Sequence, residues 1–92
     1  MGEQRRELTI VNSRGLHARA SAKFVNAVSD LPAGVSVSLV KGPNSAAGGS
    51  ILGLMMLGAA RGDTIELVVT GDPSGEVIER LGALVASGFG EE

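Results

Sequence analysis

The stretch "VSVSLV", residues 35–40, carries the clearest structural pattern in this chain. Val35, Val37 and Leu39 alternate with serines, so a strand here turns apolar side chains to one face and hydroxyls to the other. One polar face is typical of an antiparallel sheet that contacts water on that side. The pattern therefore predicts a sheet whose other face is covered by helices.

The segments around this strand predict the other elements. Apolar alternation and flanking turn residues predict three further strands, over residues 7–12, 45–47 and 63–70. Helical spacing predicts three helices, over residues 18–29, 50–57 and 73–87. Asp72 is the expected cap of the last helix, with Pro73 in its first turn. The 50–57 stretch also allows a strand, but its Leu and Met residues behind a serine favour a helix.

The order of these elements is strand, helix, strand, strand, helix, strand, helix. It predicts an α/β (α+β) fold, an open-faced β-sandwich in which three helices cover one face of a four-stranded antiparallel sheet. A chain of 92 residues has room for one core, so we expect a single domain spanning residues 1–92. With 43% hydrophobic but only 2% aromatic residues, that core is expected to be mostly aliphatic.

Composition also bounds the function. The absence of cysteine excludes disulfides and thiolate metal sites. A net charge of −2, without aromatic residues interleaved with basic ones, disfavours nucleic acid as a partner. The first residues lack a signal-peptide core, and no run reaches the roughly 18 apolar residues of a membrane span. We expect a cytoplasmic monomer without membrane insertion.

The only histidine lies in "RGLHARASAKF", residues 14–24, just before the first predicted helix. Gly15 is expected to loosen the approach to this helix, so that first-turn amides can converge on a small anion. Arg19 adds positive charge, and we expect no acidic residue nearby to neutralise it. The helix N-terminus favours a neutral His17 with a free lone pair, which is a nucleophile. The pattern therefore suits a phosphohistidine.

Other interpretations of His17 are a surface or capping histidine, and a module that binds phosphate or a metabolite without covalent transfer. One histidine without cysteines or a carboxylate cluster cannot complete a zinc site, so we expect no metal and no cofactor. A serine-histidine-acid triad lacks both a strained nucleophile turn and an obvious orienting acid.

Three segments resemble the HPr family, the histidine-containing phosphocarriers of the bacterial phosphoenolpyruvate-dependent phosphotransferase system. They are "GLHARASAKFV" at residues 15–25, "GGSILGLMML" at residues 48–57 and "ASGFGEE" at residues 86–92. The resemblance implies that His17 accepts a phosphoryl group on Nδ1 from phosphorylated enzyme I and passes it to a IIA domain, in sugar uptake or in a nitrogen-related regulatory branch. Such a protein is a stoichiometric carrier and not an enzyme. The expected phosphate-binding residues at the helix mouth are Gly15, Ala18, Arg19 and Ala20.

Two positions depart from the family pattern. Ala20 stands where the family usually has proline, which restores a backbone N–H in the first turn. Gly49 stands where the family commonly has lysine, just before Ser50. The resemblance implies phosphorylation of Ser50 by HPr kinase/phosphorylase, and the missing lysine leaves this open. From the residues alone, Ser50 is a helix N-cap.

The segment "ILGLMML" is apolar on every side of a short helix, so part of it is expected to contact water. We expect Leu54 and Leu57 in the core. The rest predicts a docking surface to which flexible methionines are suited, and which would also serve a protein acting only as an adaptor. Its expected residues are Leu16, Ile51, Leu52 and Met55.

Overall fold

A computed structural model describes residues 2–91, so the ends of the predicted domain, Met1 and Glu92, lie outside the described residues. The elements are β1 (Glu3–Thr9), α1 (Ala18–Ser29), β2 (Ser36–Lys41), β3 (Asn44–Ala47), α2 (Ile51–Met56), β4 (Thr64–Thr70) and α3 (Glu76–Ala86). The predicted order of strands and helices is confirmed.

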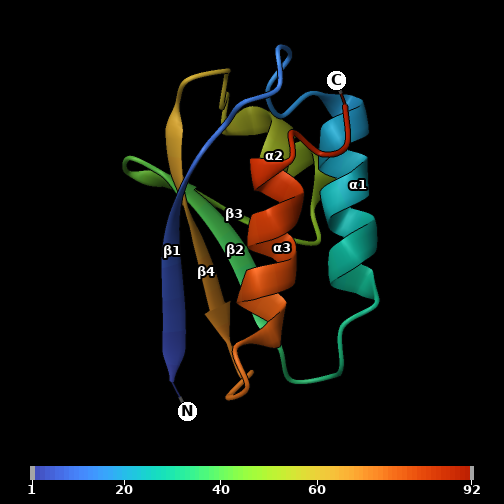
Figure 1. Cartoon of the computed structure of the whole chain (residues 1–92), viewed down its shortest axis with the longest axis vertical. Coiled ribbons are helices and arrows are strands. Elements are labelled where there is room, and N and C mark those ends of the chain that lie inside the picture. Colours follow the sequence, from blue (N-terminus) through green and yellow to red (C-terminus); the bar gives the residue numbers. More distant parts are fainter. Residues whose placement is uncertain (1, 92) are drawn as a thin grey trace.

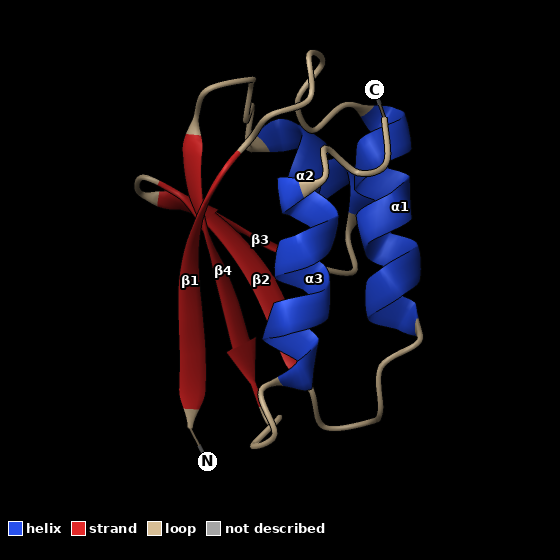
Figure 2. Ribbon diagram, in the orientation of Figure 1, coloured by secondary structure: helices blue, strands red, loops and turns tan. Residues whose placement is uncertain are grey.

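The four strands form one antiparallel sheet in the order β1-β4-β2-β3. The three helices cover one face of this sheet and leave the other face open (Figures 1 and 2). Val37 pairs with Val69 and Leu39 with Leu67, and all four side chains are buried. The apolar side chains that alternate in residues 35–40 therefore face the helix-covered core, as predicted, and the open-faced sandwich is confirmed.

Each layer contributes side chains to the core. Phe24 of α1, Leu54 of α2, Val85 of α3 and Leu67 of β4 are fully buried. Phe89, which follows α3, is buried among them. Among residues 2–91, no helix is long and apolar enough to cross a membrane.

The first strand differs from its prediction. It spans Glu3–Thr9, so the expected range of residues 7–12 is wrong at both ends. The missed residues are mostly charged, and the alternation of apolar side chains does not find them. Ion pairs tie them to the neighbouring elements: Arg5 to Glu66 on β4 at 2.7 Å, and Arg6 to Glu79 on α3 at 2.8 Å.

The last helix starts later than predicted, at Glu76, and Pro73 lies in the turn before it. The N-cap is Gly75, so the expectation that Asp72 is the cap residue is wrong. The Asp72 carboxylate still accepts hydrogen bonds from the Val77 N–H at 2.8 Å and from the Ser74 hydroxyl at 2.7 Å. These bonds, above all the one from Val77, hold the pKa of Asp72 below its usual value. The predicted helix end near residue 87 is confirmed.

Candidate functional site

Gly15 sets the path of the chain into α1. Its φ of +63° lies in the left-handed region, and a Cβ there would lie 2.9 Å from Ala60 Cα and closer still to the Ala59 carbonyl oxygen. The next residue locks this approach, because the Leu16 N–H donates to the Ala59 carbonyl at 3.0 Å. The expectation that Gly15 loosens the entry to the helix is therefore wrong, since the glycine permits a close and fixed contact.

His17 is the N-cap of α1, as its position before the helix predicts. Its backbone is extended, and its Nδ1 accepts a hydrogen bond from the Arg19 N–H at 3.2 Å. The first helical hydrogen bond runs from the Ser21 N–H to the His17 carbonyl at 2.9 Å, so the amides of Ala18, Arg19 and Ala20 precede it. The imidazole therefore turns Nδ1 toward the positive end of the helix.

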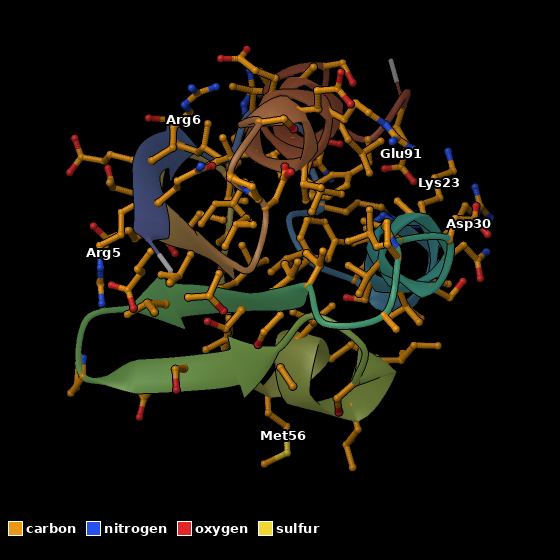
Figure 3. All side chains as sticks on the ribbon, turned by 90° about the horizontal axis from the view of Figure 1, so that it is seen from below. Arg5, Arg6, Lys23, Asp30, Met56 and Glu91 are labelled. Carbon is orange, nitrogen blue, oxygen red and sulfur yellow. The ribbon has the colours of Figure 1, made fainter. Side chains whose placement is uncertain are left out.

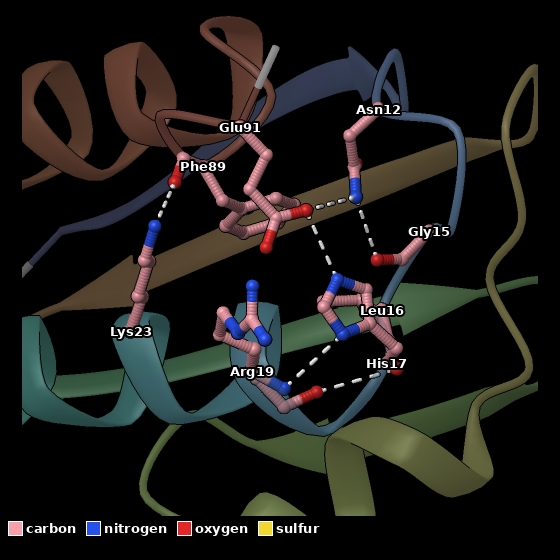
Figure 4. Close-up of polar contacts among 9 residues, drawn as sticks. Asn12, Gly15, Leu16, His17, Arg19, Lys23, Phe89 and Glu91 are labelled. Carbon is pink, nitrogen blue, oxygen red and sulfur yellow. Dashed lines mark hydrogen bonds and ion pairs between the residues drawn. The ribbon is translucent and has the colours of Figure 1, made fainter.

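The opposite ring nitrogen contacts a carboxylate. Nε2 of His17 lies 3.0 Å from Oε1 of Glu91, which follows α3 (Figure 4). The expectation that no acidic residue lies near His17 is wrong, because the fold brings together residues that are 74 apart in the sequence. The hydrogen bond from His17 is the main influence that lowers the pKa of Glu91, and the Lys23 charge adds to it.

The residues that brace this pair were not predicted. Asn12 is only 3% exposed, and its Nδ2 donates to the Gly15 carbonyl at 2.9 Å and, at 3.4 Å, to the Glu91 carboxylate. Lys23 Nζ donates to the Phe89 carbonyl at 2.9 Å and ties the segment after α3 to α1. A short polar residue in a turn and a lysine on a helix carry no local sign of these contacts.

A hollow of about 520 Å³ is lined in part by Arg19 and Glu91, the two residues that contact the His17 ring. Figure 4 shows the Arg19 side chain between Lys23 and His17. The lining residues include three cations and are Ser13, Arg14, Arg19, Lys23, Gly90 and Glu91. Positive side chains beside a helix N-terminus suit an anion with several oxygen atoms. Among residues 2–91, no group of three or more histidine, cysteine or acidic side chains could hold a metal ion.

Residues 4–87 match the family model described as the PTS HPr component phosphorylation site. The chain belongs to the HPr family. It is 41% identical over 87 residues to a phosphocarrier protein HPr of Neisseria meningitidis, covering 95% of this chain and 96% of that protein. It is 36% identical to a phosphocarrier protein NPr of Shewanella violacea, covering 99% of this chain and 98% of the relative. The family members are phosphocarriers of the phosphotransferase system.

Solved structures of HPr proteins share the fold. HPr-C-His from Thermoanaerobacter tengcongensis superposes with a TM-score of 0.86 at 35% identity, covering 97% of this chain and 98% of that one. An HPr from Bacillus anthracis gives a TM-score of 0.83 at 25% identity, covering 92% and 99%. Both structures agree with the predicted sheet and its three helices.

In this HPr-family chain, α2 lies beside the start of α1 (Figures 1 and 4). Leu54 and Leu57 are buried, as predicted. The remaining large side chains form an exposed apolar surface, here called the α2 patch, which consists of Ile51, Leu52, Met55 and Met56. Met56 is 76% exposed and points away from the molecule (Figure 3).

Leu16 does not belong to this surface. It is 4% exposed and packs in the core. The expectation that Leu16 takes part in docking is therefore wrong. Leu16 instead anchors the segment that carries His17.

Ser50 is the N-cap of α2, as predicted. Its Oγ accepts a hydrogen bond from the Gly53 N–H at 2.9 Å, and the residue is half-buried. Gly49, where the family commonly has lysine, has open space around its Cβ position. Ala20, where the family usually has proline, is fully buried in the first turn of α1.

Proposed function

We propose that this HPr-family protein carries a phosphoryl group on Nδ1 of His17. The donor is phosphorylated enzyme I and the acceptor is a IIA domain, in sugar uptake or in nitrogen-related regulation. The observation that carries the proposal is the orientation of the ring, which turns Nδ1 toward the first-turn amides of α1 at 3.2 Å from the Arg19 nitrogen. The resemblance of the three sequence segments to the family supports the same assignment.

The proposed transfer uses groups that are already in place. Nδ1 leaves its hydrogen bond with the Arg19 N–H, and its lone pair forms a bond to phosphorus while the bond from phosphorus to the donor breaks. The departing donor atom keeps that electron pair. The freed amide of Arg19, the amides of Ala18 and Ala20, and the Arg19 guanidinium then face the phosphoryl oxygens, and they stabilise the charge without a metal ion.

The surroundings of His17 support exchange with two partners in turn. The hollow lined by Arg19 and Glu91 carries three cations, which attract acidic partner surfaces. The α2 patch offers flexible methionines that adapt to more than one partner. A carrier needs both features on one side of the molecule, because donor and acceptor must reach the same nitrogen.

The competing candidates predict different behaviour. A module that binds phosphate or a metabolite reversibly needs the amides and Arg19 but no reactive histidine. A capping histidine needs only the bond from the Arg19 N–H. An adaptor that acts through the α2 patch needs neither. Covalent labelling of His17 separates the carrier from all of these.

The test incubates the protein with enzyme I and labelled phosphoenolpyruvate. We expect one phosphoryl group per chain, labile in acid and stable in base, that passes to an added IIA domain. His17→Ala should abolish the label, whereas the control Ser50→Ala should retain it because Ser50 acts on another helix. Label that survives in His17→Ala contradicts the proposal. Parallel reactions with IIA domains of the sugar and nitrogen branches identify the acceptor.

Regulatory phosphorylation of Ser50 remains a prediction. Its Oγ caps α2, so a kinase must first draw it away from the Gly53 N–H. The phosphate would then lie beside the α2 patch and repel acidic partner surfaces. Labelling with HPr kinase/phosphorylase and ATP tests this, with Ser50→Ala as the unlabelled control.

A further inference from the structure

The contact between His17 and Glu91 is largely shielded from water. The His17 side chain is 20% exposed and the Glu91 side chain 16%, so little water competes for the 3.0 Å hydrogen bond between them. Oε1 of Glu91 also faces Nδ2 of Asn12, which is itself buried. Figure 3 places Glu91 and Lys23 on the same side of the molecule.

The segment that carries Glu91 is held at several points. Phe89 is 1% exposed and fixes the segment in the core, although its φ of +60° is unusual for a residue with a side chain. Lys23 binds the Phe89 carbonyl, and the Glu91 N–H donates to the Gly88 carbonyl at 3.0 Å. The carboxylate therefore has a defined position opposite the imidazole.

The two partners of the ring leave only one arrangement of its proton. A carboxylate accepts hydrogen bonds and does not donate them, so Nε2 must carry the hydrogen. A backbone amide only donates, so Nδ1 must present its lone pair to the Arg19 N–H. We infer that Glu91 is a positioning residue that, together with the Arg19 amide, fixes His17 in the tautomer whose nucleophilic nitrogen is Nδ1. This inference rests on the proposed transfer through His17.

The same carboxylate acts on the charge that transfer creates. When the Nδ1 lone pair bonds to phosphorus, the ring still carries its Nε2 proton and becomes a cation. The Glu91 carboxylate lies against that proton and stabilises the cation. When phosphorus moves on, the electron pair of the P–N bond returns to Nδ1 and a neutral imidazole leaves. No proton has to move in either direction, which keeps the phosphoryl group easy to transfer.

The first measurement reads the tautomer directly in the unphosphorylated protein. Nitrogen NMR of ring-labelled His17 should show the single form protonated on Nε2. Glu91→Gln should give a mixture, because its amide can accept from Nε2 or donate to it, and the 3.2 Å hydrogen bond from the Arg19 N–H is then the only contact that favours one form. The matched control is Glu76→Gln, which removes the same charge at an exposed position on α3 and should keep the single form. An unchanged tautomer in Glu91→Gln overturns the inference.

The second measurement follows the phosphorylated protein. Glu91→Gln should accept phosphoryl groups from enzyme I about 10- to 100-fold more slowly, as expected for loss of a hydrogen bond to a charged group. The phosphorylated Glu91→Gln protein should also hydrolyse more slowly. Without the carboxylate the phosphorylated ring loses its Nε2 proton more readily, and a ring without this proton is a poorer leaving group. A purely structural role would leave hydrolysis unchanged or speed it by admitting water, and either result overturns the inference.

The two proposals fail in different ways. If the unaltered protein takes no label on His17, the proposed function fails, and the tautomer measurement still tests the contact with Glu91. If the protein is labelled but Glu91→Gln behaves like Glu76→Gln, the function stands and the role of Glu91 fails.

Discussion

Gly15→Ala should destabilise the fold more than any ordinary glycine substitution in a loop. The residue has a positive φ, and an added Cβ would overlap the backbone of Ala59 and Ala60. Gly58 is a matched control, since its φ of +66° is nearly the same as the +63° of Gly15 and nothing lies within 4 Å of its Cβ position. Gly58→Ala therefore reports the cost of the backbone conformation alone.

The expected free energies follow from these surroundings. A left-handed conformation costs an alanine about 1 kcal/mol, which is the whole effect expected at Gly58. At Gly15 the overlap with backbone atoms adds about 1–3 kcal/mol, because backbone cannot rotate away as a side chain can. Gly15→Ala should therefore lose about 2–4 kcal/mol, a large part of the roughly 5–15 kcal/mol that stabilises a small domain.

Urea unfolding followed by circular dichroism measures both variants. With a slope of about 1–2 kcal/mol per molar urea, Gly15→Ala should shift the midpoint by about 1–4 M and Gly58→Ala by less than about 1 M. The phosphoryl-acceptance assay should show a larger loss for Gly15→Ala, because Gly15 places His17. Equal midpoints for the two variants would refute the role assigned to the Ala59 contact.

Three further changes test other parts of the structure. Gly82→Ala on α3 should raise the unfolding free energy by about 0.5–1 kcal/mol in urea titrations, because alanine favours a helix more than glycine does. The structure has room for it, since the added Cβ would meet the Arg6 side chain at an ordinary 3.5 Å. Met55→Glu should weaken binding to enzyme I in calorimetry with the fold intact, whereas Leu54→Ala, in the core, should lose about 2–5 kcal/mol of stability. Asp72→Asn should be less stable than the parent at neutral pH. Since the folded pKa of Asp72 lies below its usual 3.8, the difference in stability between the parent and Asp72→Asn should shrink as the pH falls through and below 3.8. A difference that stays constant with pH would contradict the stabilising role of the Asp72 hydrogen bonds.

The elements that the sequence predicts well are those whose local pattern matches their burial. Residues 35–40 alternate because one face of β2 is covered and the other is open. The start of β1 escapes this rule, because its partners are the charged side chains of β4 and α3. Pro73 suits a first helical turn, but the Asp72 hydrogen bonds form a turn that delays the helix to Glu76.

In the site, too, the residues placed by local sequence could be predicted and those placed by tertiary packing could not. The position of His17 at the mouth of α1 follows from local spacing, and so does the capping by Ser50. Glu91 could not be predicted, because only the packing of α3 against the sheet and the burial of Phe89 bring it to the imidazole. Leu16 shows the opposite error, since an apolar residue next to the histidine is consistent with either docking or the core, and only its burial in the fold decides.

The strand order has a consequence for how the chain is made. β1 pairs only with β4, and Arg5 and Glu66, which bridge them, are separated by 61 residues. At about 5–20 residues per second of synthesis, the first strand emerges from the ribosome roughly 3–12 s before its partner exists. Its row of charged side chains then keeps the unpaired edge soluble and discourages association with other nascent chains.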